Sequence, residues 1–221
     1  GRSALYARKN VVIDASALPH GVTVKWMGGA ADPARVLAVY GDLTLTNVRI
    51  TGGRSVARDI STTNQDQPWT LARGGGLAVW GRATLTDSEI YDNHCSGDCD
   101  PSRDRGAFGG GLYANIVEVR NSVISGNTVT GAGAAGGGVY SVGGADSHLA
   151  TSMIERSSIS GNSIHGLFTY GGGLYSDGGG IGNSKYLKVS NSTIARNVAG
   201  PAPGLPSFLL GMGYWRGGGV Y

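Results

Sequence analysis

A motif that recurs about every 35 residues constrains this sequence more than any other feature. The motif opens with three glycines, continues with an aliphatic residue and usually a tyrosine, and ends on Ile-x-x-Asn. The isoleucines of four copies, Ile90, Ile124, Ile159 and Ile194, are separated by 34, 35 and 35 residues. A unit of this size cannot bury its own apolar face, so successive units must stack to form a core. The sequence therefore predicts a repeat protein.

The repeat leaves no room for a second independent core. A weaker copy, LTLTNVRITGG, places Ile50 at the isoleucine position before the regular copies begin. We therefore expect one domain over residues 1–221, with entry coils at 1–53 and repeat coils at 54–221. The triple glycine at 217–219 opens a further copy just before the last residue, which predicts that the native chain continues. The first residues, GRSALYARKN, lack the apolar segment of a signal peptide.

Apolar and turn residues alternate in a way that predicts short strands and no helices. In the first third we expect strands at Val11–Ile13, Val22–Trp26, Val36–Val39 and Leu43–Leu45. Each repeat should hold three strands: one at Gly-Gly-Gly-[Leu/Val]-Tyr, one ending at Leu85 and its equivalents Val119, Ile154 and Val189, and one at the isoleucine. Equivalent strands of neighbouring coils then pair in parallel, ~4.8 Å apart. The predicted fold is all-β, a right-handed parallel β-helix (solenoid) with irregular loop insertions, because such coils are unlike the hexapeptide repeats of left-handed β-helices.

Stacking places equivalent residues above one another in columns. The aliphatic residues after the glycines are expected to fill the interior: Leu112, Val139, Leu174 and Val220. The asparagines are expected to form a structural ladder of side-chain amides at a turn: Asn93, Asn127, Asn162 and Asn197. Tight bends are expected at the polar pairs between the second and third strands: Asp87-Ser88, Asn121-Ser122, Arg156-Ser157 and Asn191-Ser192.

The pairing of the triple-glycine motif with Ile-x-x-Asn resembles the GGAI and FxxN repeats of the chlamydial polymorphic outer membrane proteins, with Gly in place of Ala and Ile in place of Phe. It is similar also to bacterial secreted repeat proteins with right-handed β-helix coils. The segment VVIDASALPHGVTV resembles the entry region of those proteins. The resemblance covers residues 11–221. It implies a secreted or cell-surface bacterial protein, since such repeats occur in adhesins, autotransporter passengers and polysaccharide-acting proteins.

Loops on a rigid scaffold often carry function, and here the chain is expected to leave the stack after each Ile-x-x-Asn. The loop DNHCSGDCDPSRDRG holds the chain's two cysteines, Cys95 and Cys99, which we interpret as a disulfide rather than free thiols. Zinc on His94 and the two cysteines is an alternative that lacks a fourth ligand. Calcium on three loop carboxylates is another, although a solvated turn is the preferred interpretation: Asp98, Asp100 and Asp104. No other cofactor is expected.

The same loop carries the enzyme hypothesis. A polysaccharide lyase or glycoside hydrolase would draw its catalytic groups from the one dense cluster of suitable residues: Asp98, Asp100, Arg103 and Asp104. No catalytic set recurs at positions that stacking brings together. We therefore favour a protein without catalytic activity.

The tyrosines of the triple-glycine strand are expected to point outward, because strand neighbours alternate between faces. Tyr113, Tyr140 and Tyr175 would then form a row on which sugar rings could dock. In the alternative, the insertions 141–150 and 176–185 fold over this face and the tyrosines support them. Both interpretations stay open at this stage.

Charged residues make up 15% of the chain and the formal net charge is +3, which gives no strong attraction to nucleic acid. No apolar run approaches the ~18 residues of a membrane helix, so we expect no membrane insertion by this chain. The leading hypothesis is an adhesin-like extracellular or bacterial cell-surface module that contacts polysaccharide or a cell-surface partner. A structural fibre or spacer that self-associates end to end is a third hypothesis.

Overall fold

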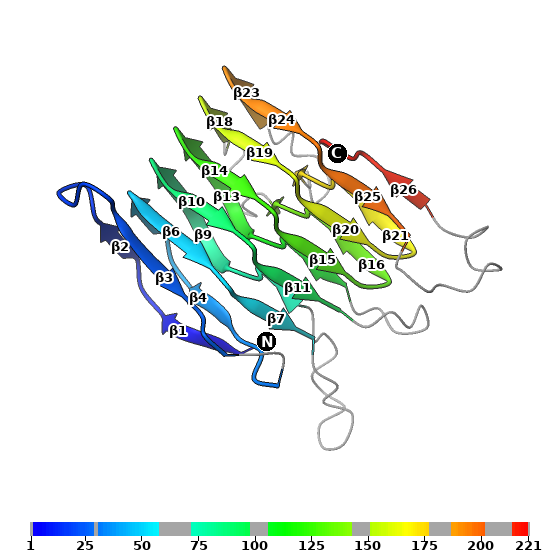
Figure 1. The fold of residues 1–221 in the computed structure, drawn as a ribbon, viewed down its shortest axis with the longest axis horizontal. Helices are drawn as coiled ribbons and strands as arrows, with labels where there is room; N and C mark the ends of the chain where they lie inside the picture. Colours follow the sequence, from blue (N-terminus) through cyan, green and yellow to red (C-terminus); the bar gives the residue numbers. More distant parts are fainter. Residues whose placement is uncertain are drawn as a thin grey trace.

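The computed structural model describes residues 2–28, 31–57, 72–97, 106–142, 151–176, 187–201 and 214–220. These residues form strands and turns without any helix, and their strands pair in parallel with the equivalent strands of neighbouring coils. In Figure 1 the coils follow one another from the blue N-terminal strands to the orange and red C-terminal strands. The prediction of an all-β, parallel-stranded repeat protein is confirmed.

The described strands belong to four sheets, named A to D here. Sheet A contains β1 (Ser3–Ala7), β2 (Val11–Asp14), β4 (Arg35–Val39), β5 (Leu43–Thr46), β9 (Leu77–Thr86), β13 (Leu112–Arg120), β17 (Val139–Ser141), β18 (Ser152–Glu155), β22 (Leu174–Ser176) and β23 (Leu187–Ser190). Sheet B contains β3 (Val22–Lys25), β6 (Val48–Thr51), β10 (Glu89–Tyr91), β14 (Val123–Ser125), β19 (Ser158–Ser160) and β24 (Thr193–Ala195). Sheet C contains β7 (Arg54–Val56), β11 (His94–Ser96), β15 (Thr128–Thr130), β20 (Ser163–His165) and β25 (Val198–Gly200). Sheet D contains β8 (Ala72–Arg73), β12 (Ala107–Phe108), β16 (Gly133–Ala135), β21 (Phe168–Tyr170) and β26 (Tyr214–Arg216).

From β6 onward, the chain visits the sheets in the order B, C, D and A. From β10 the chain turns at Asn93 into β11, reaches β12, turns at the triple glycine 109–111 into β13, and bends at Asn121 into β14. The prediction of three strands per coil therefore missed the strands of sheets C and D. The prediction that the chain leaves the stack after the asparagine was wrong, because the strand of sheet C follows there. The apolar side chain two residues beyond Asn93, Asn127 and Asn162 is fully buried and holds the next strand in the stack: Cys95, Val129 and Ile164.

The interior is built from the predicted aliphatic columns. Leu112 lies in register with Val139, and Ile90 with Ile124 and Ile50, and these side chains are fully buried. Burial of one such side chain contributes ~1.5–3 kcal/mol. The columns become exposed in the last described coil. Val220, which was predicted for the interior, is 44% exposed there and Val189 of β23 is 41% exposed, because among the described residues a neighbouring coil covers them on one side only.

The four asparagines form a ladder along the turn between sheets B and C. The Nδ2 atom of Asn93 donates to Oδ1 of Asn127 over 3.0 Å, and the same bond joins Asn127 to Asn162 and Asn162 to Asn197. The Oδ1 atoms of Asn127, Asn162 and Asn197 also accept the backbone N–H of the preceding asparagine, at 3.0 to 3.1 Å, and Oδ1 of Asn93 accepts that of Gly53 at 2.9 Å. The ladder satisfies polar groups that are costly to bury alone.

The triple glycine faces this ladder, which explains why the two motifs occur together. Gly109 adopts a left-handed backbone with φ of 70°, which starts the turn into sheet A. A Cβ atom on Gly110 would lie 2.2 Å from the carbonyl oxygen of Gly137 in the next coil, and one on Gly111 would lie 2.9 Å from the amide of Asn127. Only glycine allows this close approach of neighbouring turns.

The predicted bends between sheets A and B are present. Asp87, Asn121, Arg156 and Asn191 all have left-handed φ angles, between 48° and 50°. The serine that follows each bend makes a second ladder, which the sequence pattern had not led us to expect. In it the backbone N–H of Ser88 donates to Oγ of Ser122 over 3.0 Å, and the bond repeats from Ser122 to Ser157.

Candidate ligand-binding site

The tyrosines of the triple-glycine strands form a continuous column beside sheet A. Tyr113 and Tyr140 stack with ring centroids 5.5 Å apart and 5° between their planes, and Tyr140 and Tyr175 stack at 4.9 Å and 18°. The rings lie outside the main core in a separate apolar cluster that includes Phe108 and Ala135. The column is therefore on the predicted outward side.

The predicted exposed row for sugar docking is wrong for two of these tyrosines. Tyr113 is only 7% exposed and Tyr140 only 9%, and each ring face is covered by the next ring in the column. A sugar cannot stack on a face that another ring already covers. Tyr175 is half-buried. Nearly all of the two insertions, 141–150 and 176–185, falls outside the described residues.

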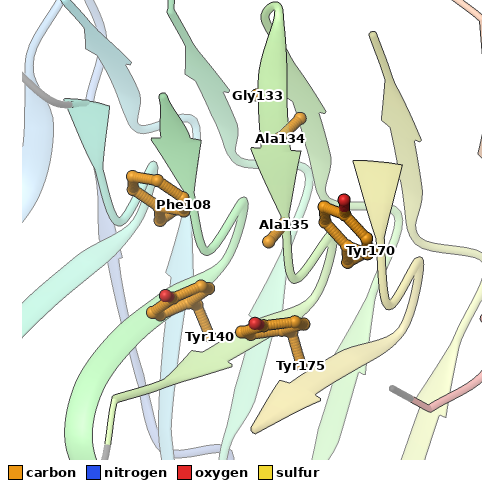
Figure 2. A pocket seen from close by; sticks show the side chains of 7 residues that line it. All are labelled: Phe108, Gly133, Ala134, Ala135, Tyr140, Tyr170 and Tyr175. Atoms are coloured by element: carbon orange, nitrogen blue, oxygen red, sulfur yellow. The ribbon is translucent and has the colours of Figure 1, made fainter. Parts of the chain in front are cut away.

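A cavity of about 150 Å³ opens next to this column and is named the aromatic slot here. Its lining comes from strands of sheets A and D and their flanks: Phe108, Gly133, Ala134, Ala135, Tyr140, Tyr170 and Tyr175. Figure 2 shows Phe108 and Tyr170 on opposite sides of Ala135, with Tyr140 and Tyr175 along a third side. A cavity of ~150 Å³ is large enough for benzene. The aromatic slot therefore has room for one six-membered ring.

The aromatic slot exists because a small residue interrupts a column of large ones. On sheet D, Phe108 is in register with Ala135, and Ala135 with Tyr170. Phe108 and Tyr170 are thus two strand spacings apart, roughly 10 Å. No charged side chain belongs to the described lining, and its polar side-chain groups are tyrosine hydroxyls. Such a lining suits a ligand with a flat apolar face and hydroxyl groups at its edge.

Arg73 stands beside the aromatic slot, next to Phe108 in the register of sheet D. Its guanidinium carbon lies 5.3 Å from the ring centroid of Tyr113, within cation–π range. The Nε atom is buried and has no hydrogen-bond partner, and Arg73 forms no ion pair with the described residues. As far as the described residues extend, a half-buried cation without a counter-charge therefore lies one strand beyond Phe108, which lines the slot.

A second aromatic group lies toward the N-terminal end of the same side and was not foreseen. Tyr6 and Tyr40 are 54% and 51% exposed. Tyr40 stacks on Trp80 at 4.2 Å, and Trp80 approaches Tyr113 at 6.3 Å, so the aromatic contacts continue into the tyrosine column. The rings of Tyr6 and Tyr40 are tilted by 56° to each other.

The cysteine prediction needs correction. Cys95 is a free thiol with no exposed surface, since its side chain points into the stack between those of Ser55 and Val129 in the register of sheet C. Its Sγ atom lies 3.7 Å from the carbonyl oxygen of Phe108, and burial raises the pKa of the thiol to about 12. The structure therefore does not contain the predicted disulfide, and Cys99 lies outside the described residues.

The zinc alternative is not supported either. His94 and Cys95 are neighbours in β11, so their side chains lie on opposite faces of sheet C. Burial and, to a smaller extent, the charge of Arg54 lower the pKa of His94. Among the described residues, no three His, Cys, Asp or Glu side chains gather as a metal site would require. The candidate catalytic and calcium residues fall outside the described part of the chain: Asp98, Asp100, Arg103 and Asp104.

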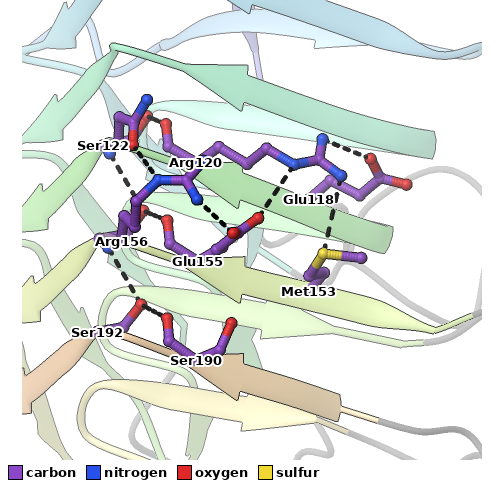
Figure 3. A network of polar contacts seen from close by, with 10 residues as sticks. Glu118, Arg120, Ser122, Met153, Glu155, Arg156, Ser190 and Ser192 are labelled. Carbon is purple, nitrogen blue, oxygen red and sulfur yellow. Dashed lines mark hydrogen bonds and ion pairs between the residues drawn. The ribbon is translucent and has the colours of Figure 1, made fainter.

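The carboxylates of β13 and β18, on the outer face of sheet A, are paired with arginines. Arg120 reaches Glu118 at 3.2 Å and Glu155 at 3.7 Å, and Arg156 also contacts Glu155. Figure 3 shows this network beside the serine ladder. Because every acid in it has a basic partner, we interpret the network as a solvated surface that aligns the coils.

The sequence contains a signal for the aromatic slot, although the repeat motif alone does not reveal it. The residue directly before each triple glycine is the outward residue of sheet D: Arg73, Phe108, Ala135 and Tyr170 in successive coils.

Comparison with family models, curated proteins and solved structures found no match. In the described part of the chain, no helix has the length and apolarity needed to cross a membrane.

Proposed function

We propose that this protein is an extracellular or bacterial cell-surface module that binds polysaccharide without chemical turnover, on a right-handed parallel β-helix. The observation that carries the proposal is the aromatic slot, which has the volume of one ring and an aromatic lining. Pyranose rings present apolar C–H faces that pack on aromatic side chains, while their hydroxyls remain near water or tyrosine hydroxyls. The resemblance to secreted bacterial repeat proteins supports the location.

The proposal differs from the sequence-based one in the place of contact. Tyr113 supports the site from behind, Tyr140 lines one side of it, and the ligand ring lies between Phe108 and Tyr170. The rigid stack of coils holds these rings in place before the ligand arrives, which reduces the entropic cost of binding.

A glycan panel that includes neutral and acidic polysaccharides tests the proposal. The Ala135→Phe variant places a ring where Phe108 and Tyr170 already carry rings in the same column, so it fills the aromatic slot and should abolish binding. Tyr6→Ala serves as the matched control because it removes an exposed aromatic ring distant from the slot. Binding that survives in Ala135→Phe, or no binding to any glycan by the unaltered protein, would count against the proposal. Polysaccharide that is shortened during the assay would instead indicate an enzyme.

A further inference from the structure

Arg73 is unusual among the described arginines near the aromatic slot. It is half-buried, its Nε atom has no partner, and no carboxylate of the described residues lies within ion-pair distance. On sheet A, by contrast, Arg82 is paired with Glu118. A partly desolvated cation without a counter-charge is costly unless an anion from outside completes the site.

A second cation strengthens the positive potential here. The pKa of Arg35 is lowered mainly by burial, with a smaller contribution from the charge of Arg73, so the two guanidinium groups are close enough to repel each other. Arg35 is almost fully buried and belongs to β4, whereas Arg73 lies nearer the surface at the end of β8. An incoming anion would therefore meet Arg73 first.

The distance between Arg73 and the aromatic slot follows from the spacing of the strands in sheet D. Arg73, Phe108 and Ala135 are in register on sheet D, so Arg73 lies two strands, roughly 10 Å, from the floor of the slot. A ring held in the slot cannot itself reach so far, but the next unit of a chain can pass over Phe108. The anion therefore belongs to a neighbouring unit of the same polymer.

We infer that the ligand is an acidic polysaccharide, with one sugar ring in the aromatic slot and a carboxylate of an adjacent uronic acid unit on Arg73. The inference rests on the proposed function and specifies its ligand class. The guanidinium group suits this role because it offers a planar pair of N–H donors to a carboxylate.

The test compares polygalacturonate, alginate and hyaluronan with the carboxyl-reduced form of each polymer, which keeps the rings and removes the charge. At least one acidic polymer should bind about tenfold more tightly than its reduced form. Raising the salt concentration from about 50 to about 500 mM should narrow the difference, because salt screens a charge that is partly exposed.

Three arginine variants test whether Arg73 is the source of this preference. Arg73→Gln should lower the affinity for the acidic polymer about tenfold and leave the reduced polymer unaffected, while Arg73→Lys should retain part of the preference. Arg82→Gln changes the net charge equally and should have no effect. Circular dichroism of each variant verifies that the stack is folded. Equal affinity for acidic and reduced forms, binding to neutral glycans only, or equal losses in Arg73→Gln and Arg82→Gln would overturn the inference while the proposed function stands. Absence of binding to any glycan would overturn both.

Discussion

Removing one amide from the middle of the asparagine ladder should destabilise the protein strongly. Asn127 has no exposed surface and makes four side-chain hydrogen bonds. Its Oδ1 atom accepts from the backbone N–H and the Nδ2 atom of Asn93, at 3.1 and 3.0 Å, and its Nδ2 atom donates to the carbonyl of Ile90 and to Oδ1 of Asn162, at 2.9 and 3.0 Å. Asn127→Ala leaves the buried backbone N–H of Asn93 without this acceptor.

The expected magnitude follows from the number of bonds and their burial. An unsatisfied buried donor costs ~1–3 kcal/mol, and each remaining hydrogen bond contributes ~0.5–1.5 kcal/mol. We expect Asn127→Ala to lower the free energy of unfolding by ~3–5 kcal/mol. Asn197 lies at the half-exposed end of the same ladder, where water can replace the amide, so Asn197→Ala should cost only ~1–2 kcal/mol.

The Asn127→Asp variant tests whether stability depends on the hydrogen bonds of the ladder or only on the volume of the side chain. A carboxylate keeps the acceptor role but faces the oxygens of Ile90 and Asn162 without donors. Burial raises the pKa of such an acid, so the folded state binds the proton more tightly and the variant should gain stability as pH falls. Urea unfolding followed by circular dichroism measures all three variants. A loss below ~1 kcal/mol in Asn127→Ala, or equal losses at positions 127 and 197, would refute the reasoning.

Three further predictions address the slot, the thiol of Cys95 and the half-buried His94. Ala135→Phe should raise the unfolding midpoint, by roughly 1 kcal/mol of stability, because the new ring fills a cavity without displacing atoms, and a lower midpoint would contradict an open slot. Cys95 should resist thiol reagents in the folded protein and react after unfolding without reductant, since burial raises its pKa to about 12, whereas no reaction in denaturant would reveal a disulfide. The lowered pKa of His94 means that the unfolded state binds more protons, so stability should fall as pH drops below about 6.5, and His94→Gln should flatten that part of the pH profile.

The repeat made much of the fold predictable. Four strands of the first third were placed within one residue of β2, β3, β4 and β5, because alternating Val and Ile residues between turn residues mark strands clearly. The columns of isoleucine and asparagine followed from the period alone. Side chains that occupy equivalent places in successive coils meet the same neighbours, so their roles repeat as well.

The missed strands and the aromatic slot have physical reasons. Strands of two or three residues in sheets C and D, such as β11 and β12, are too short for an alternating pattern to stand out. The residues directly before the triple glycines, Phe108, Ala135 and Tyr170, share no residue type, so the repeat motif did not draw attention to them. The burial of Tyr113 was unpredictable for another reason, because alternation gives the face of a sheet and not what packs upon it.

Cysteine cross-linking between neighbouring coils tests the register of the stack most directly. Val123 and Ser158 are partners on the outer face of sheet B, whereas Ser160 lies one pleat further along the same face. In a Cys99→Ser background, the pair Val123→Cys and Ser158→Cys has a Cα separation of about 4.8 Å and should form a disulfide on mild oxidation. The pair Val123→Cys and Ser160→Cys should not, since its separation of roughly 8 Å exceeds the reach of that bond. Cross-linking of the second pair in preference to the first would contradict the stacking of residues 35 apart.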